Sequence, residues 1–427
     1  MRAGLINSVN AIKPLVKKVV PPGIIRAGKK VVERRVQKQM IRDSKLPYEE
    51  GAFPFGINLI GPVDAATGLG QSFRLVERAV CEAGIPSRII PFAATVCHRV
   101  DIQAYQEKIT DRPVYSVNLW HVSPLEFTEL YARMGRQAFD RHYNIAYWLW
   151  ETEDFPDEWV GHEAVLDEIW TPSAFITEAL KKKVRIPVFT MPYWVSAPTD
   201  PEKYNRKWFG LPENEFLYLM MYDGHSVAQR KNPDGVISAY KRAVAAASGS
   251  LTADDGRKAG LVIKAGSLTE KESRELSEKL SGCPNTHIIS GSFEKTEVNS
   301  LIACADVLVS LHRAEGFGLV MAEAMLNEVP VVATDWSANT EFMDEQAACM
   351  VPCRMVRLKR DIPPYKKGSR WAQPDTGAAA QFMKQLAKDG TYRAEKRLNG
   401  LHCVREKLGR DRIVGLLRER LDRFRTD

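Results

Sequence analysis

The chain has 427 residues, 44% of them hydrophobic and 26% charged, which is the composition of a globular protein large enough for two domains. No apolar run approaches the ~18 residues of a membrane span, and lysines and a proline interrupt the region where a signal peptide would have its apolar core. The net charge is +10 in residues 1–45, −14 in residues 46–353 and +11 in residues 354–427. Because a nucleic-acid-binding protein more often has a basic stripe on its folded body, nucleic acid is not an expected partner. The basic ends fit an anionic membrane surface, unless they are simply solvated helix faces.

The seven cysteines are scattered, and only Cys349 and Cys353 lie close together in the sequence. Because this pair has no second pair and no histidine nearby, it makes a poor zinc site, and we expect buried thiols. Such a use of cysteine is typical of the reducing cytoplasm.

Residues 1–45 place apolar side chains at helical spacing, with lysine and arginine on the other face. The pattern predicts a basic amphipathic helical segment that is interrupted at Pro21-Pro22-Gly23. A helix of this kind either lies in a membrane interface or packs on the globular body.

Apolar runs then alternate with helical patterns, and this alternation predicts two series of strands. The first series is 55–62, 87–92, 114–121, 143–151, 168–173 and 188–195, and after a polar linker at 198–208 the second is 215–223, 260–266, 286–292, 306–312, 330–335 and 348–353. Continuous apolar strands separated by helices indicate parallel sheets covered on both faces. We therefore predict an α/β fold of two doubly wound Rossmann-like domains, 46–198 and 199–400, whose ligands bind beyond the carboxyl ends of the strands. Residues 354–372 are predicted to be a loop insertion, and 401–427 a basic helix for which the first domain is one packing site.

A glycine-containing loop with Gly68 and Gly70 follows the first strand and precedes a helix, as in loops that meet phosphate or sugar. A dinucleotide-binding fingerprint would need a small residue at Phe73 or Arg74 and an acid at the end of the second strand. That strand instead ends in Pro91-Phe92, so we do not expect NAD to bind.

The stretch LHRAEGFGLVMAEAM, residues 311–325, places Glu315, two glycines and Glu323 just past a buried strand. The glycines permit a tight turn, and a helix that begins at about Leu319 would offer unpaired amides to a phosphate. Carboxylates on both sides of that turn suit sugar hydroxyls, so the stretch predicts a site for a sugar nucleotide. The alternative is that Glu323 merely favours the helix dipole and that Glu315 is exposed.

Cations follow two strands of the second series. Arg230 and Lys231 are adjacent in the loop after strand 215–223, and Lys264 lies near the end of strand 260–266. A lysine buried at a strand end is costly without an anion, which favours a ligand-binding role for Lys264, although a snorkelling surface lysine remains the alternative.

His121 ends a predicted strand, where a sugar contact and a structural role are both open. The segment YWLWETED, residues 147–154, combines Trp148 and Trp150 with Glu151 and Glu153. Aromatic rings beside carboxylates suit carbohydrate, but alternating aromatics on a strand more often belong to the core.

The sequence EGFGLVMAEAM, residues 315–325, resembles the hallmark of the glycosyltransferase group 1 family, retaining enzymes of the GT-B fold. That hallmark is two glutamates separated by seven residues around a glycine turn. The following NEVPVVATDWSANTEFM, residues 327–343, is similar to the family's usual continuation, and the resemblance covers most of residues 55–350. It implies two Rossmann-like domains that face an interdomain cleft.

On this resemblance, Glu323 would hold the ribose hydroxyls of the donor, and Glu315 would contact the transferred sugar. The backbone of Gly316, Phe317, Gly318 and Leu319 would meet the diphosphate or the sugar.

Lys231 stands where the family has its lysine for the diphosphate, but Ser226 replaces the usual arginine, so Arg230 or Lys264 would supply the second charge. The resemblance also implies that His121 lies near the transferring sugar and that the loop with Gly68 and Gly70 faces the donor across the cleft. No metal or other cofactor is expected.

The expected function is retaining transfer of a sugar from a nucleotide-diphosphate donor to a glycan or lipid-linked acceptor, in surface or extracellular polysaccharide synthesis. We expect a cytoplasmic protein that can dock on the inner face of an anionic membrane. Two other functions are a non-catalytic sugar-nucleotide or polysaccharide-binding protein, and a glycan phosphorylase or synthase, which a lysine bound to pyridoxal would indicate.

Overall fold

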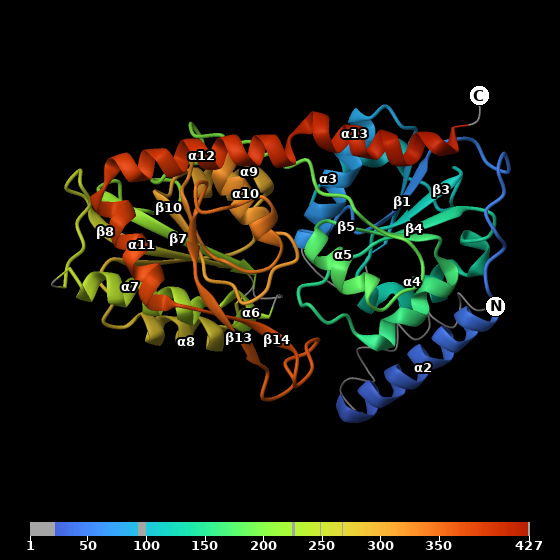
Figure 1. The fold of residues 1–427 in the computed structure, drawn as a ribbon, viewed down its shortest axis with the longest axis horizontal. Coiled ribbons are helices and arrows are strands. Elements are labelled where there is room, and N and C mark those ends of the chain that lie inside the picture. The colour runs from blue at the N-terminus through green and yellow to red at the C-terminus, as the bar shows by residue number, and fades with distance from the viewer. Residues whose placement is uncertain (1–21, 93–99, 224–226, 248, 267, 426–427) are drawn as a thin grey trace.

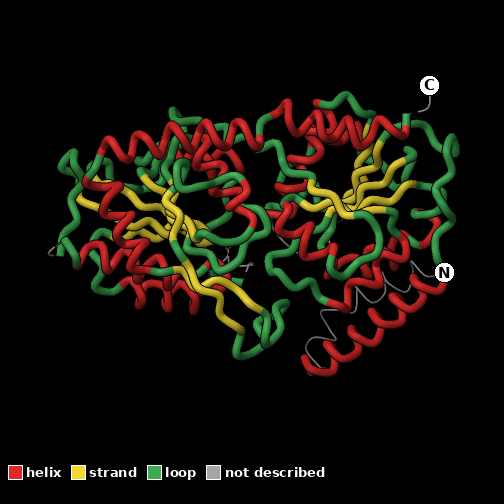
Figure 2. The backbone as a smooth tube through the Cα atoms, in the orientation of Figure 1, coloured by secondary structure: helices red, strands yellow, loops and turns green. Residues whose placement is uncertain are grey.

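The computed structural model describes residues 22–92, 100–223, 227–247, 249–266 and 268–425, with side chains from residue 31 onward. Two α/β bodies lie side by side, and a long helical segment at the C-terminal end runs along both of them (Figure 1). Each body contains a sheet between layers of helices (Figure 2).

The sheet of the first domain is parallel, and within the described residues it has the strand order β2-β1-β3-β4-β5-β6. Its strands are β1 (Ile57–Gly61), β2 (Ser87–Pro91), β3 (Val117–Trp120), β4 (Tyr143–Tyr147), β5 (Glu168–Thr171) and β6 (Val188–Thr190). Its α-helices are α3 (Gly68–Glu82), α4 (Pro124–Met134) and α5 (Ala174–Lys181). It also contains the 3₁₀ helices η1 (Gln103–Lys108), η2 (Arg136–Ala138) and η3 (Asp157–Val165). All residues of β1, β3 and β5 are buried, as expected for strands covered on both faces.

The second domain repeats this plan with the parallel order β12-β11-β10-β7-β8-β9 among its described strands. Its strands are β7 (Glu215–Asp223), β8 (Lys258–Gly266), β9 (Thr286–Ser290), β10 (Val307–Ser310), β11 (Val331–Thr334) and β12 (Cys349–Val351). Its helices are α6 (Ala228–Lys231), α7 (Pro233–Ala245), α8 (Glu270–Leu280), α9 (Lys295–Ala303), α10 (Leu319–Leu326) and α11 (Thr376–Lys388), with the short turn η4 (Ala338–Glu341).

Each sheet has one point where the direction of strand succession reverses, and ligands of open α/β sheets bind in the crevice there. In the first domain the reversal lies between β1 and β3, so the glycine loop and His121 come together at this point. In the second domain it lies between β7 and β10, which brings the segment with Lys231 next to the segment with Glu315. The strand order, not the spacing in sequence, therefore places these four segments at the two crevices where a ligand can bind.

The predicted strands are all present, and the predicted fold class is confirmed. Two details differ from the prediction. β4 ends at Tyr147, so residues 148–151 leave the sheet. The expected loop insertion at 354–372 is instead an antiparallel hairpin, β13 (Cys353–Arg357) and β14 (Arg370–Pro374), in which Val356 pairs with Trp371. Trp371 is buried, and this burial gives the hairpin the apolar support that a basic loop would lack.

The C-terminal helices join the two domains. α12 (Gly390–Leu408) packs on α10 in the second domain, and α13 (Arg410–Leu421) packs on α3 in the first, followed by the turn η5 (Asp422–Phe424). Arg410 forms an ion pair with Glu82, and Arg418 Nε donates to the carbonyl of Ala83 at 3.1 Å. Of the predicted basic helix at 401–427, α13 and η5 therefore lie on the N-terminal domain, whereas residues 401–408 belong to α12 on the second domain.

The helix α2 (Pro22–Arg42) packs against the first domain. Met40 is fully buried, Gln37 donates to the carbonyl of Glu158 at 2.7 Å, and Lys45 pairs with Asp167 at 2.9 Å. Of the basic N-terminal segment, residues 22–45 therefore pack on the first domain. Residues 1–21 lie outside the described residues. Among the helices that are described, none is both long and apolar enough to cross a bilayer.

Candidate functional site

Oppositely charged side chains meet at the carboxyl edge of the second sheet. α6 follows β7 and carries Arg230 and Lys231, and the loop after β10 carries Glu315. Lys231 Nζ forms an ion pair with Glu315 Oε2, and Arg230 Nη1 lies 3.4 Å from Glu315 Oε1. Neighbouring parallel strands end at the same edge, which is why residues 84 and 85 positions apart are in contact.

Glu315 is held as an anion. Burial raises the pKa of its carboxyl, but Lys231 and Arg230 outweigh burial and lower that pKa to about 2. The backbone amide of Glu315 donates to Ser337 Oγ at 3.0 Å, which fixes the turn. A carboxylate in this state accepts hydrogen bonds from hydroxyl groups at any physiological pH.

The two glycines of this turn have different roles. Gly318 has φ +104°, a conformation that side chains rarely adopt, and it leads directly into α10. A Cβ at Gly316 would lie 2.7 Å from the carbonyl oxygen of Trp150, and the Gly316 carbonyl accepts a hydrogen bond from Ser173 at 2.9 Å. Gly316 therefore permits close approach of the first domain, a role that its position in the motif did not indicate.

The other two members of the turn offer a ligand mainly their backbone. The side chain of Phe317 is buried, with its ring 4.7 Å from that of Tyr193 and 5.5 Å from that of Phe342. Leu319 begins α10 and is half-buried.

Glu323 lies in α10 with 1% of its side chain exposed. Lys295 Nζ, at the start of α9, lies 2.5 Å from its Oε1, yet neither carboxylate oxygen has a well-formed hydrogen bond within the described residues. Burial raises the pKa of Glu323, and Lys295 opposes that rise. Sequence reasoning missed Lys295, because only the fold brings the start of α9 to α10.

Lys264 lies at the carboxyl end of β8, where its Nζ is 5.2 Å from the ring centroid of Phe293. Burial lowers its pKa, and Asp223 acts in the opposite direction. In the part of the chain that the structure describes, Lys264 forms no hydrogen bond or ion pair with Glu315 and none with α6, the segment of Lys231. The structure therefore groups Arg230 and Lys231 with Glu315 and places Lys264 apart from them.

His121 is enclosed in the first domain with none of its surface exposed. Its Nε2 lies 2.8 Å from Ser72 Oγ, and its ring stacks on that of Tyr147 at 4.5 Å. Burial lowers its pKa to about 3, so the imidazole is neutral at pH 7. Ser72 Oγ in turn donates to the hydroxyl of Tyr193 at 2.6 Å, and this links His121 to the residue that packs on Phe317.

In the loop after β1, Gly68 is exposed at the first turn of α3 and has open space where a side chain would stand. A Cβ at Gly70 would lie only 2.1 Å from the carbonyl oxygen of Ala65, so Gly70 is required by the packing of the loop itself. Gly70 also donates its amide to Thr67 Oγ1 at 3.2 Å.

Residues 203–362 match the family model described as glycosyl transferases group 1. The chain carries a group 1 glycosyltransferase domain. No curated protein matches the sequence. Solved structures are similar over both domains: HepE from Anabaena in complex with UDP-glucose has a TM-score of 0.62 at 13% identity, covering 86% of this chain and 100% of that one. Sucrose-phosphate synthase from Thermosynechococcus elongatus has a TM-score of 0.58 at 15% identity, covering 89% and 100%. These similarities confirm the predicted GT-B fold.

The side chains of Trp148 and Trp150 belong to the core, since 0% and 4% of their surfaces are exposed. A carbohydrate-stacking role for them is therefore wrong for this conformation. The neighbouring carboxylates instead form ion pairs with arginines of the second domain. Glu153 lies 3.6 Å from Arg370, and Glu151 lies 3.7 Å from Arg230.

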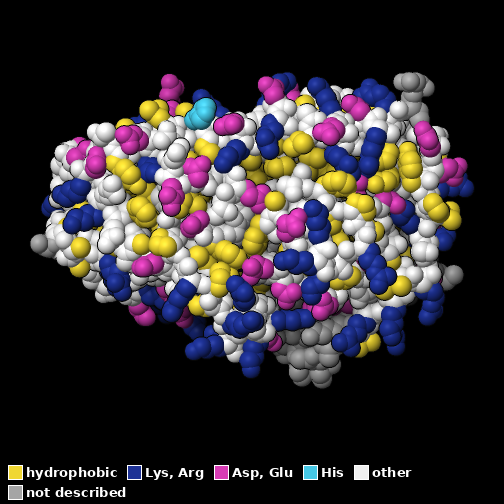
Figure 3. All heavy atoms as spheres, in the orientation of Figure 1, with side chains coloured by type: hydrophobic (Ala, Val, Ile, Leu, Met, Phe, Trp, Pro, Cys, Tyr) yellow, Lys and Arg dark blue, Asp and Glu magenta, His cyan; other side chains and the backbone are white. Residues whose placement is uncertain are grey.

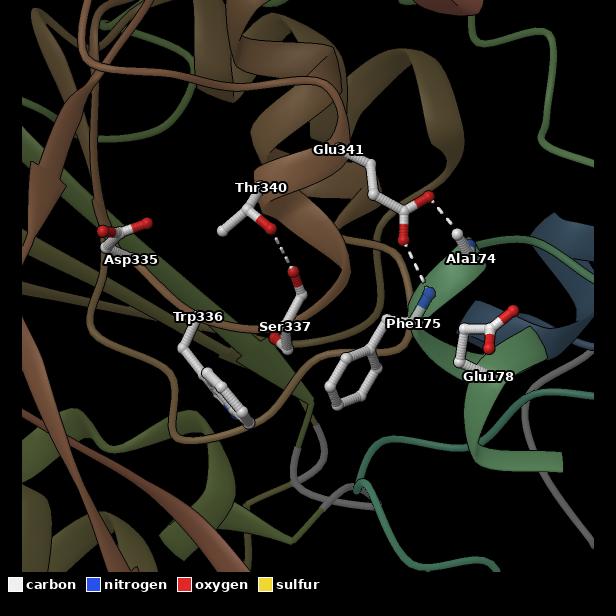
Figure 4. Close-up of a pocket in the computed structure, with 8 residues that line it drawn as sticks. All are labelled: Ala174, Phe175, Glu178, Asp335, Trp336, Ser337, Thr340 and Glu341. Atoms are coloured by element: carbon white, nitrogen blue, oxygen red, sulfur yellow. Dashed lines mark hydrogen bonds between the residues drawn. The ribbon is translucent and has the colours of Figure 1, made fainter. Parts of the chain in front are cut away.

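A depression of about 440 Å³ lies between the two domains, lined by α5 and by Asp335, Trp336, Ser337, Thr340 and Glu341. Glu341 spans it and accepts hydrogen bonds from the amides of Ala174 and Phe175, both at 2.8 Å (Figure 4). The amides at the start of α5 are thus already satisfied, and this contact joins the two domains. Among the described residues, no cluster of histidine, cysteine, aspartate and glutamate could hold a metal ion.

Proposed function

We propose that this glycosyltransferase is a retaining enzyme that moves a sugar from a nucleotide-diphosphate donor to a glycan or lipid-linked acceptor. The observation that carries the proposal is the contact of Lys231 and Arg230 with Glu315, beside the glycine turn that begins α10. Cations, free helix amides and an anionic carboxylate together suit a diphosphate joined to a polyol. HepE, which shares the fold, was solved with UDP-glucose, and this supports the donor class.

In the proposed reaction, Lys231 exchanges Glu315 for a phosphate oxygen when the donor binds. As the bond between the sugar and the phosphate breaks, negative charge grows on the leaving diphosphate, and Lys231 and the amides of the turn stabilise it. Glu315, released from Lys231, accepts a hydrogen bond from a hydroxyl of the sugar. The acceptor hydroxyl attacks from the face that the diphosphate leaves and passes its proton to the departing phosphate oxygen, so the anomeric configuration is retained without a protein nucleophile.

The first domain supplies the acceptor side in this proposal. Closure of the cleft excludes water and so limits hydrolysis of the donor. His121 lies at the switch point of that domain as a neutral group, so its role is to support the cleft wall through Ser72 and Tyr193.

Glu323→Ala is expected to weaken donor binding about tenfold or more, because charge-assisted hydrogen bonds to ribose hydroxyls contribute ~1.5–3 kcal/mol each. The measurement is calorimetric titration with UDP-, GDP- and ADP-sugars, first on the wild type and then on the variant. Glu345→Ala, an exposed acid of the same domain, is the matched control and should bind like wild type. Unchanged affinity in a folded Glu323→Ala protein would rule out the ribose role. A wild type that binds donors but never transfers or hydrolyses them would instead be a non-catalytic binding protein.

We further propose that the enzyme works in the cytoplasm and docks on an anionic membrane through its basic N-terminal segment, near a lipid-linked acceptor. On α2, Arg34, Arg35, Lys38 and Arg42 are exposed, as are Val31 and Val32 at 49% and 60%. Basic side chains also gather along the edge of the molecule where α2 and the β13–β14 hairpin lie (Figure 3). Such surfaces are attracted to anionic lipid by ~1 kcal/mol for each basic residue.

Replacing these four basic residues of α2 by glutamine should abolish co-sedimentation with anionic phospholipid vesicles at low salt. Substitution is a cleaner test than truncation, because Met40 is buried and Lys45 is paired. The control variant replaces four exposed basic residues of the second domain, Lys271, Arg274, Lys384 and Lys388, and should sediment like wild type. Equal sedimentation of both variants would contradict the docking proposal.

A further inference from the structure

The β13–β14 hairpin reaches from the second domain to the first (Figure 1). Tyr365 lies at the tip of the hairpin, and only 3% of its surface is exposed. The Tyr365 hydroxyl donates a hydrogen bond to Glu151 Oε2 at 2.8 Å. Its ring lies 5.4 Å from that of Trp150. Two further pairs join the hairpin to the same segment of the first domain, Lys366 with Glu158 at 2.5 Å and Arg370 with Glu153 at 3.6 Å, but these side chains are largely exposed.

Glu151 also contacts the donor side of the cleft. Its Oε1 lies 3.7 Å from Arg230 Nη2, and Arg230 Nη1 donates to the carbonyl of Ala314 at 2.9 Å beside Glu315. A continuous row of polar contacts therefore runs from Tyr365 through Glu151, Arg230 and Glu315 to Lys231. It passes from the hairpin through the first domain and back to the second.

Charge balance gives this row a preferred arrangement. Arg230 has only 6% of its surface exposed, so its guanidinium depends on the carboxylates of Glu151 and Glu315. Burial lowers the pKa of Arg230, but Glu151, Tyr365 and Glu315 outweigh it and raise that pKa. Without the charge of Glu151, Arg230 would have Glu315 as its one remaining carboxylate partner. It would then pull the carboxylate of Glu315 away from its present position beside Lys231.

We propose that Glu151 and Tyr365 are positioning residues for the proposed sugar transfer, which hold Arg230 and, through it, Glu315 in the reactive arrangement. This inference rests on the proposed function. It adds that the donor site is complete only when the first domain and the hairpin are in place. In this proposal both residues act through Arg230 and not on the donor itself, so their effect is on the placement of Glu315.

The test compares Glu151→Gln and Tyr365→Phe with wild type in the full-length protein. Gln keeps the size of Glu151 and a hydrogen-bond acceptor for Tyr365 but removes the charge that Arg230 needs. We expect kcat to fall about tenfold to a hundredfold in Glu151→Gln, because small displacements of reacting groups have effects of this size. Donor Kd should change less than about threefold, and the double variant should lose less than the product of the single losses, since the residues act in series.

Lys366→Gln and Arg370→Gln are the matched controls. Each removes an exposed ion pair between the same hairpin and the same segment, without touching the row that includes Arg230. The proposal predicts wild-type kcat in both. Equal losses of kcat in these controls would show that the hairpin is only a mechanical strap and would overturn the positioning role, as would wild-type kcat in folded Glu151→Gln.

Tryptic cleavage of the hairpin tip, which carries exposed Lys359, Arg360, Lys366 and Lys367, provides a readout that needs no activity. Tyr365→Phe should be cut there faster than wild type in the absence of any ligand, and equal rates would contradict anchoring through Glu151. A wild type that neither binds nor turns over any donor would refute the proposed function, and the positioning role with it. Normal wild-type transfer with an unaffected Glu151→Gln would refute the positioning role alone.

Discussion

Lys231→Met is expected to lower the turnover of sugar transfer about a hundredfold or more, with a much smaller loss of donor affinity. Loss of a single group that stabilises developing charge typically reduces kcat by about 10²–10³. The charge on the leaving diphosphate grows as the bond breaks, so a cation aimed at it stabilises the transition state more than the bound donor. Lys231 is the closer of the two cations that pair with Glu315 in the structure, and its side chain is 23% exposed.

The measurement is steady-state kinetics, with donor Kd from calorimetry on the same preparations. Lys258→Met is the matched control, because Lys258 is an exposed lysine at the start of β8. Lys264→Met, at the other end of that strand, tests the alternative second cation, and a loss of kcat in this variant would assign Lys264 to the diphosphate as well. Lys231→Met is expected to fold, since Arg230 still compensates Glu315. Wild-type turnover together with wild-type affinity would remove Lys231 from the site, and a loss of affinity with unchanged turnover would assign it to donor binding only.

The double variant Arg420→Met/Arg423→Met is expected to destabilise the first domain by about 3 kcal/mol, because an uncompensated buried charge costs that much. Glu168, at the start of β5, is 1% exposed, and both arginines reach its Oε2 at 2.8 Å from the C-terminal segment. Removing both leaves the carboxylate with hydrogen bonds from Tyr143 and Trp170 but with no cation from that segment. A loss of this size would lower the melting temperature by about 6–12 °C.

Adding Glu168→Gln to the double variant provides the control. The amide removes the buried charge, so most of the lost stability should return, whereas a loss caused by general weakening of α13 would remain. Differential scanning calorimetry with a urea melt of the same proteins measures both, and the midpoints are compared because a chain of two domains has no single free energy of unfolding. An unchanged melting temperature in the double variant would show that solvent already screens Glu168.

Most of the fold could be predicted from the sequence, because the patterns that specify it are local. Apolar runs of strand length between helical patterns predicted every strand of both sheets. The motif that begins at Glu315 likewise combines a turn, a helix start and two carboxylates within eleven residues, so its residue types and their spacing were enough to predict a site that includes its glycines and Glu323. The position of Lys231 after its strand completed that prediction.

The tertiary structure decided which side chains face one another. Glu151 is 214 positions from Tyr365, yet they share a hydrogen bond. Gly316 is required by the carbonyl of Trp150 in the other domain, and the sequence around Gly316 contains no trace of that constraint. The enclosure of His121 likewise depends on packing that a strand-end position does not reveal.

The physical reason is the difference between periodicity and contact. Apolar runs, helical periodicity and turns act through neighbours along the chain, so they can be recognised in a single sequence. Charge pairing across a cleft depends on strand order, domain apposition and the hairpin that replaced the expected loop. The sequence by itself therefore determined the two domains, and it predicted a sugar-nucleotide site at the motif that begins at Glu315. Only the folded arrangement determined that Arg230 lies between Glu151 and Glu315, while Lys264 stands apart.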